Sequence, residues 1–244
     1  MPSVAESAAI VVIGDEILSG KFADENAAYA IKVLRARGVG LRRIETVADV
    51  LDDIADAVTR CAARADHVLT SGGVGPTHDD LTMEGIARAF GVGVHRHPEL
   101  ERLLRAFYGD KLDDRNLRMA DVPVGAELVA ADHPAWPVTR MRNVYILPGI
   151  PLIFRRKLDA ILPNFTAGAF HVRRVYAMAD EAQLAAHMDA VVGAHALVQV
   201  GSYPRIEALD FRVLITLESR DPDAVVRAVD DLVARLGALV VRVE

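Results

Sequence analysis

Residues 67–90 read HVLTSGGVGPTHDDLTMEGIARAF, and this stretch decides the predicted fold. Its first five residues are typical of a short buried strand, and residues 80–90 carry the apolar spacing of a helix. Between them lies a glycine-rich loop, SGGVGPTHDD, at residues 71–80. A strand, a glycine-rich loop and a helix in this order indicate a βαβ unit, and the ligands of such sheets bind at the carboxyl ends of the strands.

The glycine-rich loop has the composition of a phosphate site. Gly72, Gly73 and Gly75 allow close backbone approach and positive φ, so successive amides can point at a phosphate. Asp79 and Asp80 would repel that anion unless a cation lay between them. We therefore expect a divalent metal such as Mg²⁺ or Mn²⁺, because oxygen ligands favour hard cations. The metal would polarise phosphorus and help to activate water.

Three further residues of this loop are candidate ligand contacts, and one alternative stays open. We expect Ser71, Thr77 and His78 to contact substrate, His78 as an acid, a base or a phosphate contact. In the alternative, Asp80 caps the following helix and the glycines form a structural turn. The loop is not a Walker A motif, since no Lys-Ser/Thr pair follows the glycines, and it is not GxGxxG.

The same alternation of strand and helix extends on both sides of the loop. Residues 8–14, AAIVVIG, form a continuous apolar run that predicts a central parallel strand. A helix is expected over 24–37, capped by Asp24 and ended at Gly38. Further strands are expected over 41–47 and 144–147, and further helices over 52–65 and from the prolines at 148–151 to about 161. This order predicts an α/β fold, a three-layer α/β/α domain with a mostly parallel sheet.

A second group of acidic and polar residues follows the first predicted strand. Gly14, Asp15 and Glu16 stand at its carboxyl end, and Asn26 lies shortly after. The carboxyl ends of parallel strands meet at one edge, so these residues face the same crevice as the glycine-rich loop. We expect Asp15 to join the two loop aspartates as a catalytic metal ligand, and the other three residues to contact substrate. The alternative for the acidic pair is a solvated turn.

A third loop, LPGIP at 147–151, follows the last predicted strand of this domain. Pro148 and Gly149 could form a wall beside a planar ring and are candidate substrate contacts. A structural turn from strand to helix is the alternative. Trp136, which lies close to two prolines, is expected to be a packing anchor, and the alternative is a ring that stacks on a ligand.

Turn and breaker residues at 163–168 predict a domain boundary. We therefore expect one domain over residues 1–165 and a small α+β domain over 169–244. The second part is predicted to contain strand 171–178, helix 181–192, strands 197–203 and 211–219, helix 222–236 and strand 238–243. This βαββαβ order is typical of a ferredoxin-like domain.

Composition narrows the class of partner. The formal net charge is −6, and basic residues do not cluster with aromatic ones, so nucleic-acid binding is not expected. Cys61 is the one cysteine of the sequence, which fits a reducing cytoplasm. No apolar run approaches the length of a membrane span and the first residues lack a signal peptide, so we expect a cytoplasmic protein without a membrane partner.

At these motifs the sequence resembles a known family. GDEILSG at 14–20, LTSGGVGPTHDDLT at 69–82 and LPGIP at 147–151 resemble the molybdopterin-binding-like domain of the competence/damage-inducible protein A family and of MoaB/Mog-type proteins. THDD at 77–80, HPELE at 97–101, RNVYILPGIP at 142–151 and GSYP at 201–204 are similar to the amino-terminal, FAD-hydrolysing region of eukaryotic FAD synthases.

The resemblance implies a metal-dependent pyrophosphatase that splits FAD or ADP-ribose into AMP and the other monophosphate. It implies that the metal is held by Asp15, Asp79 and Asp80. One alternative is a molybdenum-cofactor biosynthesis protein that binds or adenylylates molybdopterin, although Val74 stands where those relatives usually have threonine. The other is a non-enzymatic interaction module. For the first two functions the ligand is a nucleotide or pterin, whereas the interaction module would act through self-association or weak nucleic-acid contact of the small βαββαβ domain. We also expect a homo-oligomer.

Overall fold

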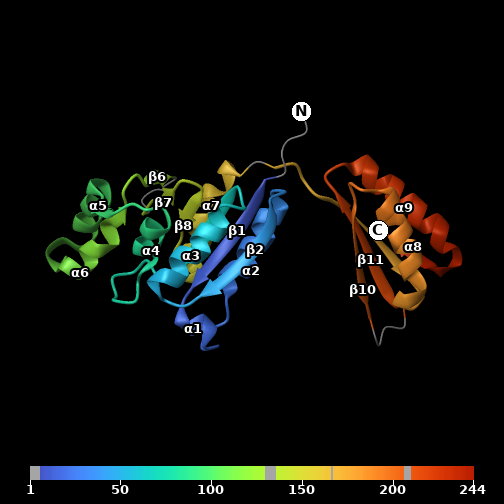
Figure 1. Cartoon of the computed structure of the whole chain (residues 1–244), viewed down its shortest axis with the longest axis horizontal. Coiled ribbons are helices and arrows are strands. Elements are labelled where there is room, and N and C mark those ends of the chain that lie inside the picture. Colours follow the sequence, from blue (N-terminus) through green and yellow to red (C-terminus); the bar gives the residue numbers. More distant parts are fainter. Residues whose placement is uncertain (1–5, 130–135, 166, 206–209) are drawn as a thin grey trace. The chain divides into compact units, whose positions relative to one another are not determined.

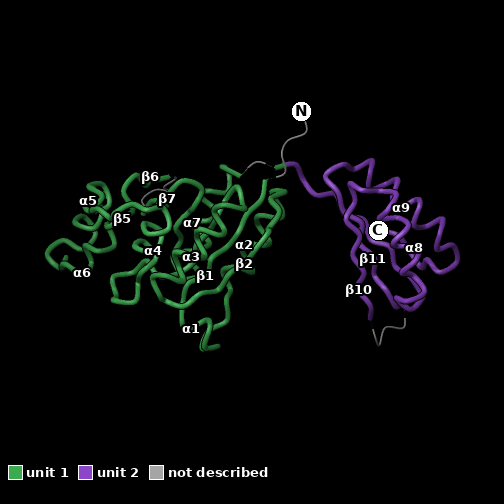
Figure 2. Tube along the Cα trace, in the orientation of Figure 1, with its two compact units in different colours: residues 1–167 green, residues 168–244 purple. Residues whose placement is uncertain are grey.

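The computed structural model of the chain describes residues 6–129, 136–165, 167–205 and 210–244. It divides into two compact units, residues Met1–Ala167 and Gly168–Glu244 (Figures 1 and 2). Unit 1 contains the three loops that the sequence marks as functional, and unit 2 contains the βαββαβ pattern.

The centre of unit 1 is a six-stranded sheet with the order β2-β1-β3-β8-β7-β6. The first four strands of this order are parallel, and β7 and β6 are antiparallel to their neighbours. The predicted fold class, a mostly parallel α/β sheet, is therefore confirmed. The strands are β1 (Ser7–Ile13), β2 (Gly40–Val47), β3 (His67–Ser71), β6 (Glu127–Val129), β7 (Val138–Met141) and β8 (Val144–Ile146).

Helices cover both faces of this sheet, which makes three layers (Figure 1). Strand β1 shows why, because its alternate residues belong to two different apolar cores. Ile10 packs in one core with helices α2 (Glu25–Ala36) and α7 (Pro151–Ile161). Val11 packs in the other with α3 (Leu51–Ala62) and α4 (Thr82–Ala89). A strand buried on both faces reads as the continuous apolar run seen in the sequence.

Local signals set the ends of several elements. The Asp24 carboxylate accepts hydrogen bonds from the backbone N–H groups of Asn26 and Ala27, and it caps α2 as predicted. Gly38 has a φ of 77° just after this helix, as expected of a terminating glycine. Helix α4 begins at Thr82, two residues later than predicted, because residues up to Asp80 belong to the glycine-rich loop. A short helix α1 (Asp15–Leu18) follows β1.

Residues 91–143 contain elements for which the sequence patterns made no prediction. Helix α5 (Pro98–Tyr108) and the short α6 (Asp114–Leu117) pack beside a two-stranded sheet of β4 (Val94–Arg96) and β5 (Asp121–Pro123). They share a small core of Leu100, Leu104, Ala120 and Val122, with Trp136 packed against it. Trp136 therefore packs against this core as expected, and it also lines the cavity described below. Short 3₁₀ helices span Gly109–Lys111, Arg118–Ala120, Leu162–Asn164 and Gly237–Leu239.

Unit 2 is a four-stranded antiparallel sheet with the order β10-β11-β9-β12. Its elements are β9 (His171–Ala177), α8 (Glu181–Ala194), β10 (Gln199–Pro204), β11 (Val213–Ser219), α9 (Pro222–Leu236) and β12 (Val240–Val243). The βαββαβ order and the pairing of the first strand with the third and fourth are those of a ferredoxin-like domain. Both helices pack on the sheet through one apolar core.

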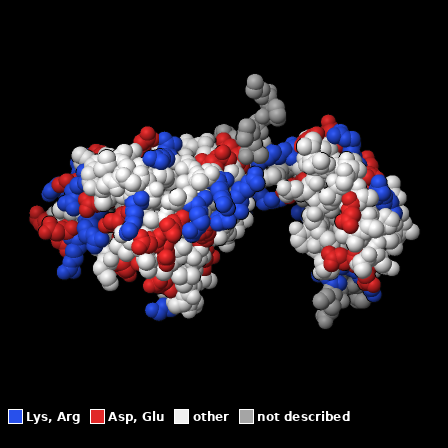
Figure 3. All heavy atoms as spheres, viewed as in Figure 1, with Lys and Arg blue, Asp and Glu red and all other residues white. Residues whose placement is uncertain are grey.

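Two surface properties bear on partners. Within the described ranges, no helix is both long and apolar enough to cross a membrane. Figure 3 shows both acidic and basic side chains on unit 1, with several basic ones gathered into a continuous group beside acidic ones.

Candidate functional site

Unit 1 contains a large cavity at the carboxyl ends of its parallel strands. Its volume is about 1320 Å³. The last residues of β1, β3 and β8, namely Ile13, Ser71 and Ile146, line it. The position is the one that the sheet topology favours for a ligand. Of the residues proposed from the sequence, the cavity is lined by Glu16, Asn26, Ser71, Gly72, Gly73, Gly75, Asp80, Pro148 and Gly149.

The first two glycines of the loop lie where a side chain would not fit. Gly72 has a φ of +109°, and a Cβ there would come within 2.1 Å of the carbonyl oxygen of Ile13. Gly73 has a φ of +62°, and its Cβ would come within 2.4 Å of Oγ1 of Thr82. The Thr82 hydroxyl is buried and donates to the carbonyl oxygen of Gly72 at 2.8 Å. The loop is therefore held tightly across the end of β1.

Asp80 organises the loop from within. Its carboxylate accepts hydrogen bonds from the backbone N–H groups of Gly75 at 2.6 Å and Thr77 at 2.8 Å, and from the Thr77 hydroxyl at 2.5 Å. The residue before α4 is Leu81, which makes no side-chain cap. The alternative in which Asp80 caps this helix is therefore wrong, because the carboxylate is turned back toward the loop.

Two loop amides remain open to a ligand. The backbone N–H groups of Gly73 and Val74 form no hydrogen bond with another residue of the described ranges. Both residues line the cavity. Consecutive free amides next to left-handed backbone form a concave group of donors suited to an anion. The phosphate-binding potential of the loop thus resides in these two amides, since those of Gly75 and Thr77 are used by Asp80.

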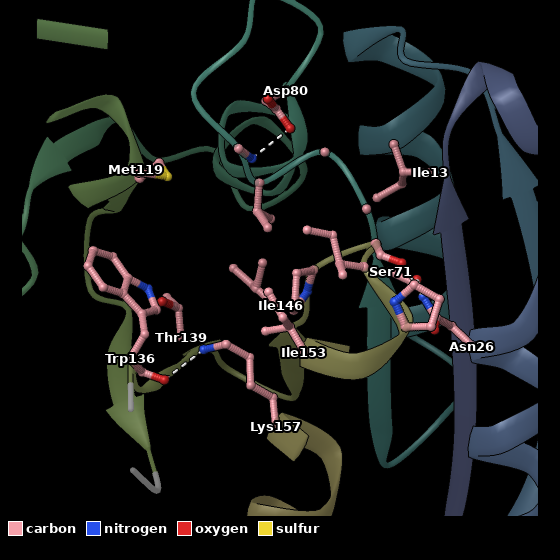
Figure 4. Close-up of a pocket in the computed structure, with 18 of the residues that line it drawn as sticks. Ile13, Asn26, Ser71, Asp80, Met119, Trp136, Thr139, Ile146, Ile153 and Lys157 are labelled. Atoms are coloured by element: carbon pink, nitrogen blue, oxygen red, sulfur yellow. Dashed lines mark hydrogen bonds between the residues drawn. The ribbon is translucent and has the colours of Figure 1, made fainter. Parts of the chain in front are cut away.

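Asn26 connects the other two loops at the floor of the cavity (Figure 4). Its side-chain amide donates to Oγ of Ser71 at 2.9 Å and to the carbonyl oxygen of Gly149 at 2.7 Å. Because a carbonyl oxygen only accepts, these contacts fix which end of the Asn26 side chain is Nδ2. The Oδ1 atom is buried and has no partner among the described residues.

Acidic side chains gather beside the cavity, at the ends of β1 and β2. Asp49 accepts a hydrogen bond from the backbone N–H of Asp15 at 2.9 Å. Burial raises the pKa of Asp49, and the hydrogen bond from Asp15 lowers it by a smaller amount. The negative charges of Glu16, Asp15 and Asp79 also raise this pKa. The three acidic residues expected here are therefore close enough to influence one another. Asp49 was missed, although it follows a predicted strand as Asp15 does.

Five of the proposed residues do not line the cavity. They are Gly14, Asp15, Thr77, His78 and Asp79. The His78 side chain is 97% exposed and lies 3.8 Å from a carboxylate oxygen of Asp79. Their predicted roles in catalysis, metal binding and substrate binding remain predictions.

The structure does not contain a preformed metal centre in the ranges it describes. There, no group of three or more His, Cys, Asp and Glu side chains is arranged to hold an ion. Both oxygens of Asp80 are occupied by loop donors. Mg²⁺, however, is commonly held by one or two carboxylates together with substrate phosphates. The carboxylates present do not form a resident ion site, because Asp15 and Asp79 do not line the cavity and both oxygens of Asp80 accept bonds within the loop.

A second residue that sequence analysis missed is Lys157, on α7. Its Nζ donates to the carbonyl oxygens of Trp136 at 2.7 Å and Pro137 at 2.8 Å. Burial lowers the pKa of Lys157 to about 8. Lys157 and Trp136 both line the cavity. In the sequence Lys157 follows two arginines and looks like part of a solvated helix face.

Fold and site together define an α/β protein with a large pocket over a glycine-rich loop. Residues 9–167 match the family model described as a probable molybdopterin binding domain. Residues 169–244 match a model described as the middle domain of FAD synthase. The chain therefore belongs to the probable molybdopterin-binding domain family, followed by a unit of the FAD synthase middle-domain type. The resemblance inferred from the sequence motifs is confirmed.

Individual relatives agree with this assignment. A protein of Archaeoglobus fulgidus is 34% identical over 220 residues, which cover 90% of this chain and 93% of that protein. A probable FAD synthase of Caenorhabditis briggsae is 30% identical over 91% of this chain, and the chain spans about half of that relative, 48%. The crystal structure of CinA from Thermoplasma acidophilum, a protein of unknown function, is 31% identical with a TM-score of 0.61, covering 66% of this chain and 98% of the other.

Proposed function

We propose that this chain is a dinucleotide pyrophosphatase acting on FAD. Water adds to one phosphorus, the bond from that phosphorus to the bridging oxygen breaks, and the products are AMP and FMN. The observation that carries the proposal is the pair of free amides at Gly73 and Val74, which open into a cavity large enough for both halves of a dinucleotide. Support comes from the relative called a probable FAD synthase and from the middle-domain match.

Each chemical requirement has a candidate group in the cavity. The two free amides would bind a phosphate oxygen and stabilise the charge that develops as water attacks. Asn26 would keep the glycine-rich loop and the loop after β8 in place around the substrate, through its bonds to Ser71 and Gly149. Asp80 would keep the loop in shape through its bonds to Gly75 and Thr77.

A divalent metal is part of this proposal. Asp15, Asp79 and Asp80 are the carboxylates proposed to hold Mg²⁺ or Mn²⁺, one or two of them together with the substrate phosphates. When bound, the ion would neutralise the pyrophosphate charge and polarise the phosphorus. The acidic residues around Asp49 make the site negative, so a pyrophosphate without a cation would be repelled. This repulsion is why the proposal includes the metal.

The experiment is incubation of the purified chain with FAD, with ADP-ribose and with each plus excess EDTA, followed by chromatography. The proposal expects AMP and FMN from FAD with Mg²⁺ or Mn²⁺, and no products after metal has been stripped. If FAD stays intact with every divalent metal while the protein remains folded, the proposal is wrong. If EDTA has no effect, hydrolysis does not use the metal.

A pterin ligand is the second candidate, and the family description favours it. The same free amides of Gly73 and Val74 suit a molybdopterin phosphate. Tight binding of molybdopterin without hydrolysis of FAD would support this function in place of the first. The homo-oligomer predicted from the sequence also remains a proposal, which light scattering of the purified chain would test.

A further inference from the structure

Lys157 is a cation at the wall of the cavity without an acidic partner. It forms no ion pair with a carboxylate of the described ranges, and its Nζ is held by the carbonyl oxygens of Trp136 and Pro137. An ammonium group has three N–H donors, so one remains after these two bonds. An ammonium group that is shielded from water and has no anion beside it destabilises the folded protein unless its third N–H also finds an acceptor. The residue borders the cavity, so a ligand atom can supply that acceptor.

The side chains around Lys157 are mostly apolar. Figure 4 shows the Trp136 indole on one side of the cavity and Ile146 and Ile153 beside the Lys157 stem. Met119 and Thr139 complete this part of the wall. We call the six residues the ring subsite: Met119, Trp136, Thr139, Ile146, Ile153 and Lys157. An aromatic ring and branched aliphatic side chains next to one fixed donor match a flat heteroaromatic group that carries a carbonyl.

We propose that the ring subsite binds the isoalloxazine ring of the flavin half of the substrate, with Lys157 donating a hydrogen bond to a ring carbonyl oxygen. This inference rests on the proposed function for the presence of a flavin. It assigns Lys157 and Trp136 to substrate selection, a role that the sequence context of Lys157 does not suggest.

The chemistry of Lys157 favours a ring carbonyl over a phosphate. The partial negative charges of two backbone carbonyl oxygens already lie next to Nζ. The one remaining N–H cannot satisfy the several oxygens of a phosphate dianion. The apolar walls would also desolvate that dianion at high cost. A neutral ring needs only one donor and gains from apolar contact. Phosphate has a better place at the free amides of Gly73 and Val74.

One consequence concerns the choice between two dinucleotides. FAD and ADP-ribose share the AMP half, but the second half of ADP-ribose is a sugar phosphate without a ring system of this kind. It would leave the ring subsite unfilled and Lys157 without its acceptor. The ring subsite therefore favours FAD.

The test uses three probes on the full chain: riboflavin, FMN and AMP. Lys157→Gln removes the charge and keeps an N–H donor for the backbone carbonyls, and Lys157→Met removes both. Lys32→Gln is the matched control, because Lys32 is exposed on α2 and does not line the cavity. Flavin affinity is measured by fluorescence titration and AMP affinity by calorimetry, with thermal melts to establish folding.

We expect both Lys157 variants to bind riboflavin and FMN about tenfold more weakly, the loss that follows from one charge-assisted hydrogen bond. AMP affinity should stay within about twofold of the wild type, and Lys32→Gln should change none of the three. Loss of FMN binding with unchanged riboflavin binding would mean that Lys157 holds a phosphate, and unchanged flavin binding would mean that it only fixes residues 136–137. Either result overturns the proposal.

The outcome is distinguishable from failure of the proposed function. If the chain binds riboflavin through Lys157 but releases no AMP from FAD, the pyrophosphatase proposal fails and the ring subsite stands. If FAD is hydrolysed and Lys157→Gln binds riboflavin as the wild type does, the pyrophosphatase stands and the ring subsite is wrong.

Discussion

The side-chain amide of Asn26 donates a hydrogen bond of 2.7 Å to the carbonyl oxygen of Gly149, a residue 123 positions later in the chain. Through this bond the start of α2 is joined to the loop after β8, and a second bond to Ser71 adds the end of β3. Three loops that the sequence marks separately are thus held together by one buried amide.

Asn26→Asp should therefore weaken both the fold and the site. The carboxylate cannot donate to Gly149, and it places a charge next to a carbonyl oxygen, which costs about 1–3 kcal/mol of unfolding free energy for a buried group. Urea unfolding measures this loss, and calorimetry with AMP measures the effect on binding. Asn116→Asp, on α6 and away from the cavity, is the matched control. Wild-type stability and affinity in Asn26→Asp would show that the three loops do not depend on this amide.

Asp80→Asn distinguishes two possible roles of the Asp80 carboxylate, which are holding the glycine-rich loop and binding a metal ion. An amide in place of the carboxylate would turn an N–H₂ group toward the donors of Gly75 or Thr77, so at least one loop bond is lost. If Asp80 holds the loop, AMP binding without metal should weaken about tenfold, the loss expected for a charge-assisted hydrogen bond.

Calorimetry in EDTA, with Asp53→Asn on the exposed side of α3 as the control, measures this effect. If Asp80 were only a metal ligand, binding without metal would stay the same or tighten, because one repulsive charge has gone. Tighter AMP binding in Asp80→Asn would therefore contradict the loop-holding role.

Gly73→Ala tests the close packing of the loop. Left-handed backbone costs a residue with a Cβ about 1–2 kcal/mol, and at Gly73 the new atom also lies 2.4 Å from Oγ1 of Thr82. Gly91 is the matched control, since its φ of +66° is nearly the same and nothing lies within 4 Å of its Cβ position. We expect Gly91→Ala to show the backbone cost alone, and Gly73→Ala to lose more stability and to bind AMP more weakly. Equal unfolding free energies for the two variants would mean that Thr82 moves aside freely.

Much of the fold could be predicted because its signals are local. The run at 8–14 predicts β1, Asp24 and Gly38 mark the two ends of α2, and the pattern at 222–236 predicts α9 with the bounds the structure shows. Each depends on side chains a few residues apart. Helix α5 was missed although it carries comparable local signals, with Pro98 in its first turn and Leu100 and Leu104 on its buried side. The strands β4, β5 and β6 are a different case, because each is only three residues long. A strand of that length is too short for a period of two to stand out.

The site could be predicted only in part, for a similar reason. Glycines and acidic residues at strand ends indicate the crevice, since topology brings those ends together. The direction of a side chain depends on distant contacts: Asp80 faces back into its loop, and Lys157 is shielded by residues 136–137, 20 and 21 positions earlier. No pattern around Lys157 distinguishes it from the exposed Arg156 beside it.

The lowered pKa of Lys157 predicts that riboflavin affinity falls and that the free energy of unfolding rises as the pH is raised. Burial lowers this pKa from 10.5 to about 8, so the side chain is charged at neutral pH and loses its proton as the pH rises through about 8. Riboflavin affinity should therefore fall between about pH 7 and about pH 9 in the wild type and stay flat in Lys157→Met, because the hydrogen bond needs the ammonium group.

Stability should move the other way over the same range. Between about 8 and 10.5 the unfolded chain holds a proton at Lys157 that the folded chain has released, so the contribution of this lysine to the unfolding free energy rises with pH. The observable is the difference in unfolding free energy between the wild type and Lys157→Met, which cancels the groups they share. It should shift in favour of the wild type as the pH rises above about 8. A difference that is constant with pH, together with pH-independent riboflavin binding in the wild type, would show that Lys157 titrates as an ordinary exposed lysine and does not contact the ring.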